Sequence, residues 1–80
     1  TTTNIYPNPS IGLVTIQDNS TAEIIKVEIF DIYNQLLLKN VPSQTKYLIN
    51  LDLTQLSSGV YFVKTYHPNS NNIQKLIITQ

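Results

Sequence analysis

The chain has 80 residues and no cysteine, which bounds it to one small domain without disulfides or thiolate metal sites. Five lysines, no arginine and five acidic residues give zero net charge, which excludes the basic balance that nucleic-acid and anionic-membrane binding usually need. One alanine, no methionine and many isoleucine, valine, leucine and tyrosine residues favour strands over helices. Apolar runs such as residues 36–38 fall far short of the roughly 20 residues that span a bilayer.

The first half of the chain predicts four strands, at residues 4–6, 13–17, 24–32 and 36–39. Pro7 and Pro9 stop the first strand and, since they cannot donate to a ladder, place it at a sheet edge. In the second strand Val14 and Ile16 are the expected core pair.

The third predicted strand alternates clearly, with Ile25, Val27 and Ile29 on one face. The other face carries Lys26, Glu28 and Phe30. In the turn that follows, Asn34 suits a left-handed backbone conformation, so this strand and residues 36–39 are expected to form a hairpin.

The second half predicts three strands, at residues 46–51, 60–66 and 73–79, with residues 67–72 breaking the chain between the last two. Residues 60–63 put apolar bulk on both faces, which is typical of a central strand buried on both sides. Leu56, Gly59 and Tyr61 have the spacing of the tyrosine corner of immunoglobulin-like sandwiches, in which the hydroxyl returns to upstream backbone.

The last predicted strand alternates as well, with Leu76 and Ile78 facing the core and Lys75 reaching solvent. Seven strands separated by recognisable turns predict an all-β fold, an Ig-like β-sandwich of antiparallel strands.

Residues typical of catalysis or metal binding are scattered. His67 is the only histidine and is expected in a loop beside Pro68, with no serine or cysteine nucleophile pattern near it. Asp18, Asp31 and Asp52 stand singly in predicted turns, where aspartate accepts local backbone hydrogen bonds more often than it binds calcium. We expect no enzymatic activity, no metal and no cofactor.

A carbohydrate surface is the other possibility that the side chains suggest. Tyr33, Tyr47 and Tyr66 could line one, although single aromatics on strands usually serve packing. Gly12 and Gly59 are too few and too far apart for a phosphate-binding loop.

Four segments of the chain carry a family resemblance: residues 5–9 (IYPNP), 27–31 (VEIFD), 56–64 (LSSGVYFVK) and 75–78 (KLII). Together they look like the successive motifs of the type A C-terminal sorting domain of the type IX (Por) secretion system of Bacteroidetes. The resemblance covers residues 4–80. It implies an Ig-like sandwich at the C-terminal end of an exported protease, glycosidase or adhesin.

The resemblance also implies a function. Such a domain directs its cargo, already carried across the inner membrane and into the periplasm by an N-terminal signal, through an outer-membrane translocon to the cell surface or the medium. A sortase-like peptidase then removes the domain. Carried over position by position, the translocon-recognition residues are Pro7, Asn8, Pro9, Gly59, Tyr61, Lys75, Leu76 and Ile77.

Two further expectations complete this interpretation. Residues 1–3 are expected to be a linker remnant and residues 4–80 the sorting domain, whose partners are the translocon, the peptidase and the upstream cargo. Neither nucleic acid nor membrane insertion is expected.

The alternative is a non-catalytic accessory sandwich of a secreted enzyme, binding carbohydrate or spacing domains, which the fold would suit equally well. One departure from the family pattern is Asn34, which stands where a glycine is usual.

Overall fold

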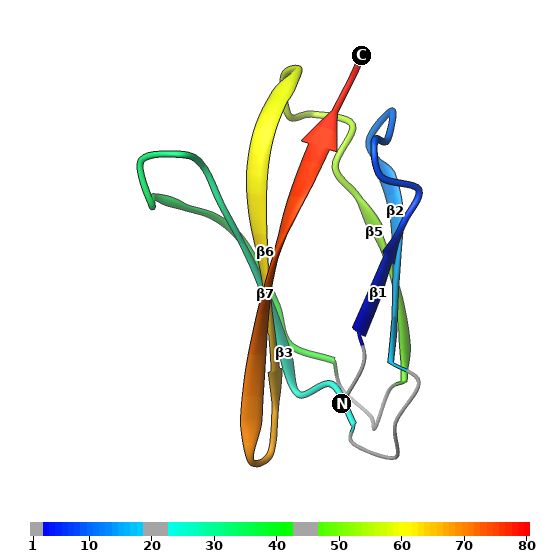
Figure 1. Ribbon diagram of the computed structural model, residues 1–80, viewed down its shortest axis with the longest axis vertical. Helices are drawn as coiled ribbons and strands as arrows, with labels where there is room; N and C mark the ends of the chain where they lie inside the picture. The colour runs from blue at the N-terminus through cyan, green and yellow to red at the C-terminus, as the bar shows by residue number, and fades with distance from the viewer. Residues whose placement is uncertain (1–2, 19–22, 43–46) are drawn as a thin grey trace.

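The computed structural model describes residues 3–18, 23–42 and 47–80. Its strands are β1 (Thr3–Tyr6), β2 (Leu13–Asp18), β3 (Lys26–Phe30), β4 (Leu36–Asn40), β5 (Leu48–Asp52), β6 (Gly59–His67) and β7 (Ser70–Ile78). They form two antiparallel sheets, ordered β1-β2-β5 and β4-β3-β6-β7, which pack face to face (Figure 1). The predicted all-β, Ig-like sandwich is confirmed.

The core lies between the two sheets and is built by strand alternation. Val14 and Ile16 from the three-stranded sheet meet Leu76 and Ile78 from the four-stranded sheet, and all four are buried as predicted. Burying a side chain of this size contributes about 1.5–3 kcal/mol, so a small domain depends strongly on each one. The side chains with almost no exposed surface are Ile16, Ile24, Val27, Ile29, Leu53, Val63, Thr65, Leu76 and Ile78.

The third strand is shorter than predicted, and its alternation starts later. Ile24 is buried at 1% exposure, whereas Ile25 is 43% exposed, so the expectation that Ile25 shares the core face of Val27 and Ile29 is wrong. Two residues, Ile25 and Lys26, separate the inward-facing Ile24 and Val27. Strict period-2 alternation therefore begins only with β3 itself.

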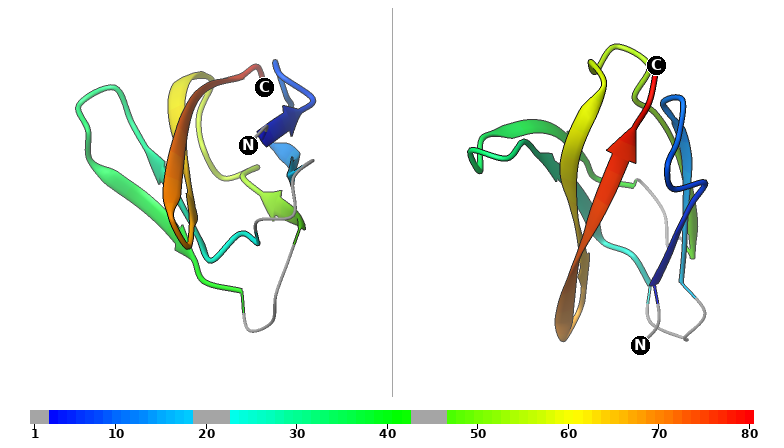
Figure 2. Two further views of the ribbon diagram at one scale, coloured as in Figure 1. Left: turned by 60° about the horizontal axis from the view of Figure 1, so that its bottom comes forward. Right: turned by 45° about the horizontal axis from the view of Figure 1, so that its top comes forward.

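The hairpin of β3 and β4 turns as predicted. Asn34 has a φ of 66°, in the left-handed region that asparagine tolerates. Asp31 Oδ1 accepts hydrogen bonds from the amides of Tyr33 (2.8 Å) and Gln35 (2.9 Å), so this aspartate is a local backbone acceptor. Figure 2 shows the hairpin extending away from the three-stranded sheet.

β6 lies inside its sheet, between β3 and β7, but it is not buried on both faces. Tyr61 and Val63 face the core, whereas Val60 is exposed and Phe62 is half-buried on the outer face. The prediction of burial on both sides is wrong because nothing in the described residues covers the outer face of this sheet. Val60 and Phe62 are part of a surface.

The link from β6 to β7 is also tighter than predicted. Residues 67–72 were expected to break the strand, but β6 runs through His67 and β7 begins at Ser70. Only Pro68 and Asn69 form the turn, since His67 and Ser70 already pair across the hairpin.

At the other end of the chain β1 begins at Thr3, so the expected linker reaches one residue into the first strand. The domain boundary at residue 4 stays a prediction.

Candidate functional site

Residues implied by the family motifs, although far apart in sequence, converge on the C-terminal half of β7. Along one edge of that half, β6 pairs Tyr61 with Leu76 and Gly59 with Ile78. Along the opposite edge lie residues 8–10. Three of the four motif segments therefore meet on one strand.

Asn8 holds one edge of β7 with its side chain. Its Nδ2 donates to the carbonyl oxygen of Lys75 (2.8 Å), and its Oδ1 accepts from the amide of Ile77 (3.0 Å). The carboxamide thus occupies the positions that a peptide group of a neighbouring strand would occupy. Pro7 and Pro9 flank it, each without a backbone donor, and the peptide bonds before both prolines are cis.

Ser10 continues the contact with its main chain. Its amide donates to Ile77 O (2.9 Å), and its carbonyl accepts from the amide of Thr79 (2.8 Å), which makes a parallel bridge opposite Ile78. The buried Ser10 hydroxyl accepts from the amide of Gly12 (2.9 Å) and donates to Leu13 O (3.0 Å). Because β1 and β2 lie in the other sheet, residues 8–10 join the two sheets along this side.

Ser10 carries no motif that marks it as part of this site. Its only local signal is a small hydroxyl residue between Pro9 and Gly12, which indicates a turn and says nothing about a distant strand. The residue acts across 67 positions of sequence, and no short motif encodes a contact of that span.

The predicted tyrosine corner is confirmed. The Tyr61 hydroxyl donates to the carbonyl of Ser57 at 2.7 Å, four residues upstream, and the side chain is buried. The hydrogen bond closes the loop that leads from β5 into β6, so it fixes where Gly59 enters the sheet.

Removing this hydroxyl is expected to destabilise the domain. Tyr61→Phe keeps the ring but leaves the carbonyl of Ser57 without its donor, and we expect a loss of about 1–3 kcal/mol in the free energy of unfolding. Tyr33→Phe is the matched control, because Tyr33 is 84% exposed and should change stability by less than about 0.5 kcal/mol. Denaturant melts of both variants measure this. Equal, small losses would contradict a structural role for the Tyr61 hydroxyl.

The end of β7 is tied to the same corner loop. Gln80 donates its amide to Ser58 Oγ (2.9 Å), and Ser58 Oγ donates to the main-chain oxygen of Gln80 (3.1 Å). The Gln80 side chain donates from Nε2 to the carbonyls of Thr54 (3.0 Å) and Leu56. These contacts, which sequence analysis also missed, hold the chain end beside the Tyr61 loop.

The eight predicted recognition residues divide by exposure. Tyr61 and Leu76 are buried and hold the fold, while Gly59 and Ile77 are half-buried. Those on the surface are Pro7, Asn8, Pro9 and Lys75. Lys75 reaches solvent, as its charge predicts. The buried Tyr61 and Leu76 cannot be contacted without unfolding the sandwich.

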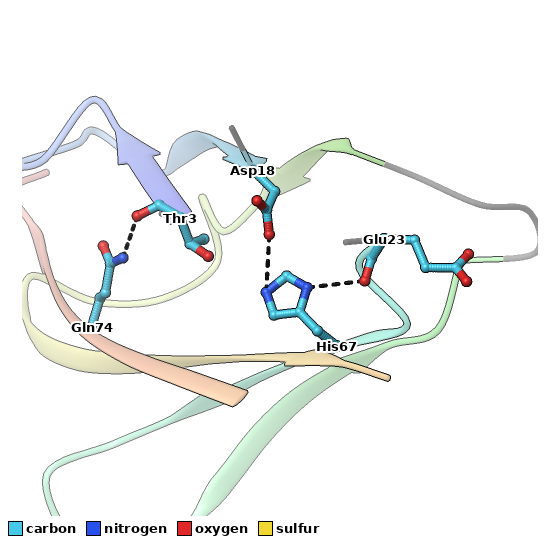
Figure 3. A network of polar contacts seen from close by, with 5 residues as sticks. All are labelled: Thr3, Asp18, Glu23, His67 and Gln74. Carbon is cyan, nitrogen blue, oxygen red and sulfur yellow. Dashed lines mark hydrogen bonds and ion pairs between the residues drawn. The ribbon is translucent and has the colours of Figure 1, made fainter. Parts of the chain in front are cut away.

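His67 is not in a loop, so that prediction is wrong. It ends β6 with its ring buried, and its Nδ1 lies 2.9 Å from the carbonyl oxygen of Glu23, while Nε2 lies 3.1 Å from Asp18 Oδ2 (Figure 3). Asp18 ends β2, so it is not a turn acceptor either. A carbonyl can only accept, so Nδ1 carries a proton. The pair joins the ends of two strands in different sheets, which is a structural role.

The other candidate groups are local. Asp52 Oδ1 accepts from the hydroxyl (2.6 Å) and the amide (3.0 Å) of Thr54, and these two hydrogen bonds lower the pKa of the Asp52 carboxyl. Among the residues that the structure describes, no three histidine, aspartate or glutamate side chains gather where a metal ion could bind. Nor is any helix of that part of the chain long and apolar enough to cross a membrane.

The three candidate tyrosines do not form one surface. Tyr66 pairs with Lys26 at the start of β3, whereas Tyr33 lies in the turn after the end of that strand. Tyr47 precedes β5 in the other sheet. A shallow hollow of about 350 Å³ lies between β2 and β5, and its lining includes none of the three. The geometry therefore gives the carbohydrate alternative no site made of these residues.

Comparison with known proteins supports the family resemblance that the sequence motifs carry. The model of the family described as the secretion system C-terminal sorting domain matches residues 4–79, nearly the whole chain. No curated protein matches. The chain therefore belongs to the family of secretion system C-terminal sorting domains, the family that its motifs resemble.

Proposed function

We propose that this domain directs a larger cargo protein through the type IX outer-membrane translocon and is then removed by a sortase-like peptidase. The family assignment places the domain in secreted or cell-surface proteins. The observation that carries the proposal further is the meeting of residues 8–10, 59–61 and 75–77 around one half of β7. The contact of Asn8 with the main chain of Lys75 and Ile77 brings the first and last of these segments side by side, where one partner can contact both.

Within this cluster, recognition falls to the exposed members. Pro7, Asn8, Pro9 and Lys75 present the surface, while Tyr61 and Leu76 keep it in place from the core. Asn8 has both roles, because its side chain also holds β7. The domain acts as a binding signal and not as a catalyst, a proposal that the structural role of its only histidine supports.

A fused reporter tests the sorting proposal. A reporter with an N-terminal signal peptide, joined to this domain at its C-terminal end, should leave a type IX-competent host and stay in the periplasm of a translocon mutant. The exported product should be shorter by about the mass of the domain, 9.1 kDa, and should stay full length in a host without the peptidase. Periplasmic retention in the competent host would refute the proposal. Export without shortening would refute the removal step alone.

A substitution of Lys75 tests recognition by the translocon apart from the stability of the domain. Because Lys75 is exposed, Lys75→Ala should change the free energy of unfolding by only about 0.5 kcal/mol. We expect the same variant to lower export of the reporter while the purified domain keeps its melting temperature. Asn71→Ala is the control, at an exposed position of the same strand away from residues 8–10. Normal export of the folded Lys75→Ala fusion would remove Lys75 from the recognition set.

A further inference from the structure

The outer face of the four-stranded sheet concentrates the positive charge of the protein. Lys26, Lys39, Lys64 and Lys75 all stand at outward positions of its strands, since their neighbours in each strand point to the core. Glu28 is the one acidic residue at an outward strand position there. This face, which we call the basic face, therefore carries 4 − 1 = +3, and the rest of the sequence, with one lysine and four acids, carries −3. Zero net charge conceals a strong separation.

Hydrogen bonds and ring contacts hold the centre of the basic face in order. Lys26 Nζ lies 3.8 Å from Glu28 Oε2 and 4.1 Å from the centroid of the Tyr66 ring, and Lys64 Nζ lies 4.9 Å from the same centroid. The Tyr66 hydroxyl donates to Glu28 Oε1 (2.6 Å). Glu28 also pairs across strands with both Lys39 and Lys64. One carboxylate among three lysines leaves an excess of positive charge beside a positioned aromatic ring.

Apolar side chains continue the face beyond the lysines. Phe30 pairs with Phe62 across β3 and β6, and Phe62 pairs in turn with Lys75 on β7. Val60 on β6 and Ile77 on β7 form the next pair on this face. The side chains of Phe30, Phe62 and Ile77 are half-buried. The result is a surface of apolar contact bordered by ammonium groups.

The opposite outer face of the sandwich also exposes apolar side chains, but it differs in charge. Its outward strand positions are Asn4, Tyr6, Leu13, Thr15, Gln17, Leu48, Asn50 and Asp52. None of them is a lysine, and two cross-strand hydrogen bonds, Tyr6 to Gln17 (2.8 Å) and Thr15 to Asn50 (2.7 Å), satisfy the polar groups among themselves. Among the described strand positions, the lysines thus all belong to one sheet of the two.

We propose that the basic face is a docking surface for an acidic protein surface of the export apparatus. An excess of positive charge on one face attracts and orients a partner of opposite charge. The apolar pairs then supply contact area once water is expelled. A protein fits better than a lipid bilayer, because membrane binding needs apolar side chains that insert about 5–10 Å, and the phenylalanines here lie half-buried in the sheet. This inference rests on the proposed function, since the partner meets the domain during export.

A pair of charge-matched variants tests the proposal. Lys26→Gln, Lys39→Gln and Lys64→Gln together lower the net charge by three on the basic face. Asn4→Asp, Gln17→Glu and Asn50→Asp lower it by three on the opposite face and keep the acceptor oxygens that Tyr6 and Thr15 use. With both purified domains folded, export of the fused reporter should fall at least tenfold for the first variant and stay within twofold for the second. Equal export of the two variants would overturn the proposal.

Two further measurements cover instability and direct contact. If the lysine triple variant melts at a lower temperature, Lys39→Gln and Lys39→Glu take its place, because Lys39 is exposed on β4, and export should fall further with Glu than with Gln. A photocrosslinking amino acid at Ile73, 60% exposed on the basic face, should form one adduct with a translocon protein in exporting cells. The same group at Leu48, on the opposite face, should not. The adduct should disappear in the lysine triple variant.

The controls distinguish this inference from the sorting proposal and from lipid binding. Failure of the unaltered fusion to be exported would refute the sorting proposal itself. Normal export of both triple variants, with no adduct at Ile73, would refute only the docking surface. Co-sedimentation of the purified domain with vesicles of 30% phosphatidylglycerol, lost in the lysine triple variant, would assign the basic face to a membrane and overturn the proposal.

Discussion

Replacing Leu76 by alanine is expected to unfold a large part of the population. Leu76 is fully buried among the core residues of both sheets, and truncating such a side chain costs about 2–5 kcal/mol through lost burial and the cavity left behind. A domain of this size has little stability beyond that. Guanidinium denaturation of the purified variant measures the loss.

The neighbouring Ile77 supplies the control. It belongs to the same motif but lies half-buried on the outer face, so Ile77→Ala should cost only about 1 kcal/mol. Similar losses for both variants would contradict the assignment of Leu76 to the core. The comparison also governs how export data are interpreted: loss of export in Leu76→Ala reports unfolding, whereas loss in a folded Ile77→Ala variant reports a surface contact.

Alanine at position 12 should be as damaging as the loss of Leu76. Gly12 has a φ of 119°, which residues with a side chain rarely adopt, and an added Cβ would lie 2.8 Å from the Cα of Thr54. The Gly12 carbonyl accepts from the amide of Leu53 at 2.6 Å, so the backbone cannot easily shift away. Strain alone costs about 1–3 kcal/mol, and the steric conflict adds to it. Thermal and denaturant melts measure the loss.

Gly59→Ala is the matched control for that substitution. Its added Cβ would meet nothing nearer than the Tyr61 ring at 3.9 Å, an ordinary contact, and its backbone needs no left-handed conformation. We expect no loss, or a gain of about 0.4–1 kcal/mol from a less flexible unfolded chain. A Gly59→Ala loss as large as that of Gly12→Ala would contradict this account. A folded Gly59→Ala domain that is not exported would place Gly59 in direct contact with the translocon.

Local patterns predicted much of this fold. Val14 and Ile16, like Leu76 and Ile78, are two residues apart and therefore share one face of their strand, because strand geometry repeats every two residues. This spacing identifies the core faces. The tyrosine corner was predictable as well, since Tyr61 reaches a carbonyl only four residues upstream. Both features depend on neighbours in sequence, which a single chain displays directly.

The errors and omissions arise where a distant partner decides the structure. Ile25 continues an apolar pattern, but the core accepts Ile24 instead, and only the packed sheets determine which. His67 beside a proline indicates a loop, yet the contacts with Asp18 and Glu23 keep it in a strand end. The joining of Asn8 to β7 spans 67 and 69 residues, and it has no local sign in the sequence.

The basic face was hidden for a related reason. Composition reports only the sum of the charges, which is zero, and their separation becomes visible once strand register places Lys39 and Lys64 on either side of Glu28. The equal numbers of lysine and acidic residues indicate no dominant charge, and they carry no information on where in the fold the charges lie.

Asn8 and Ser10 also affect how the domain behaves among copies of itself. β7 is the last strand of its sheet, and open strand edges are sites of aggregation because another chain can add to them. Here the carbonyl of Lys75, both polar main-chain groups of Ile77 and the amide of Thr79 are already occupied by these two residues. An incoming polypeptide must displace residues 8–10 before it can pair with this half of the edge. The proline-flanked asparagine therefore opposes edge-to-edge aggregation at this part of β7, even where many copies are crowded together.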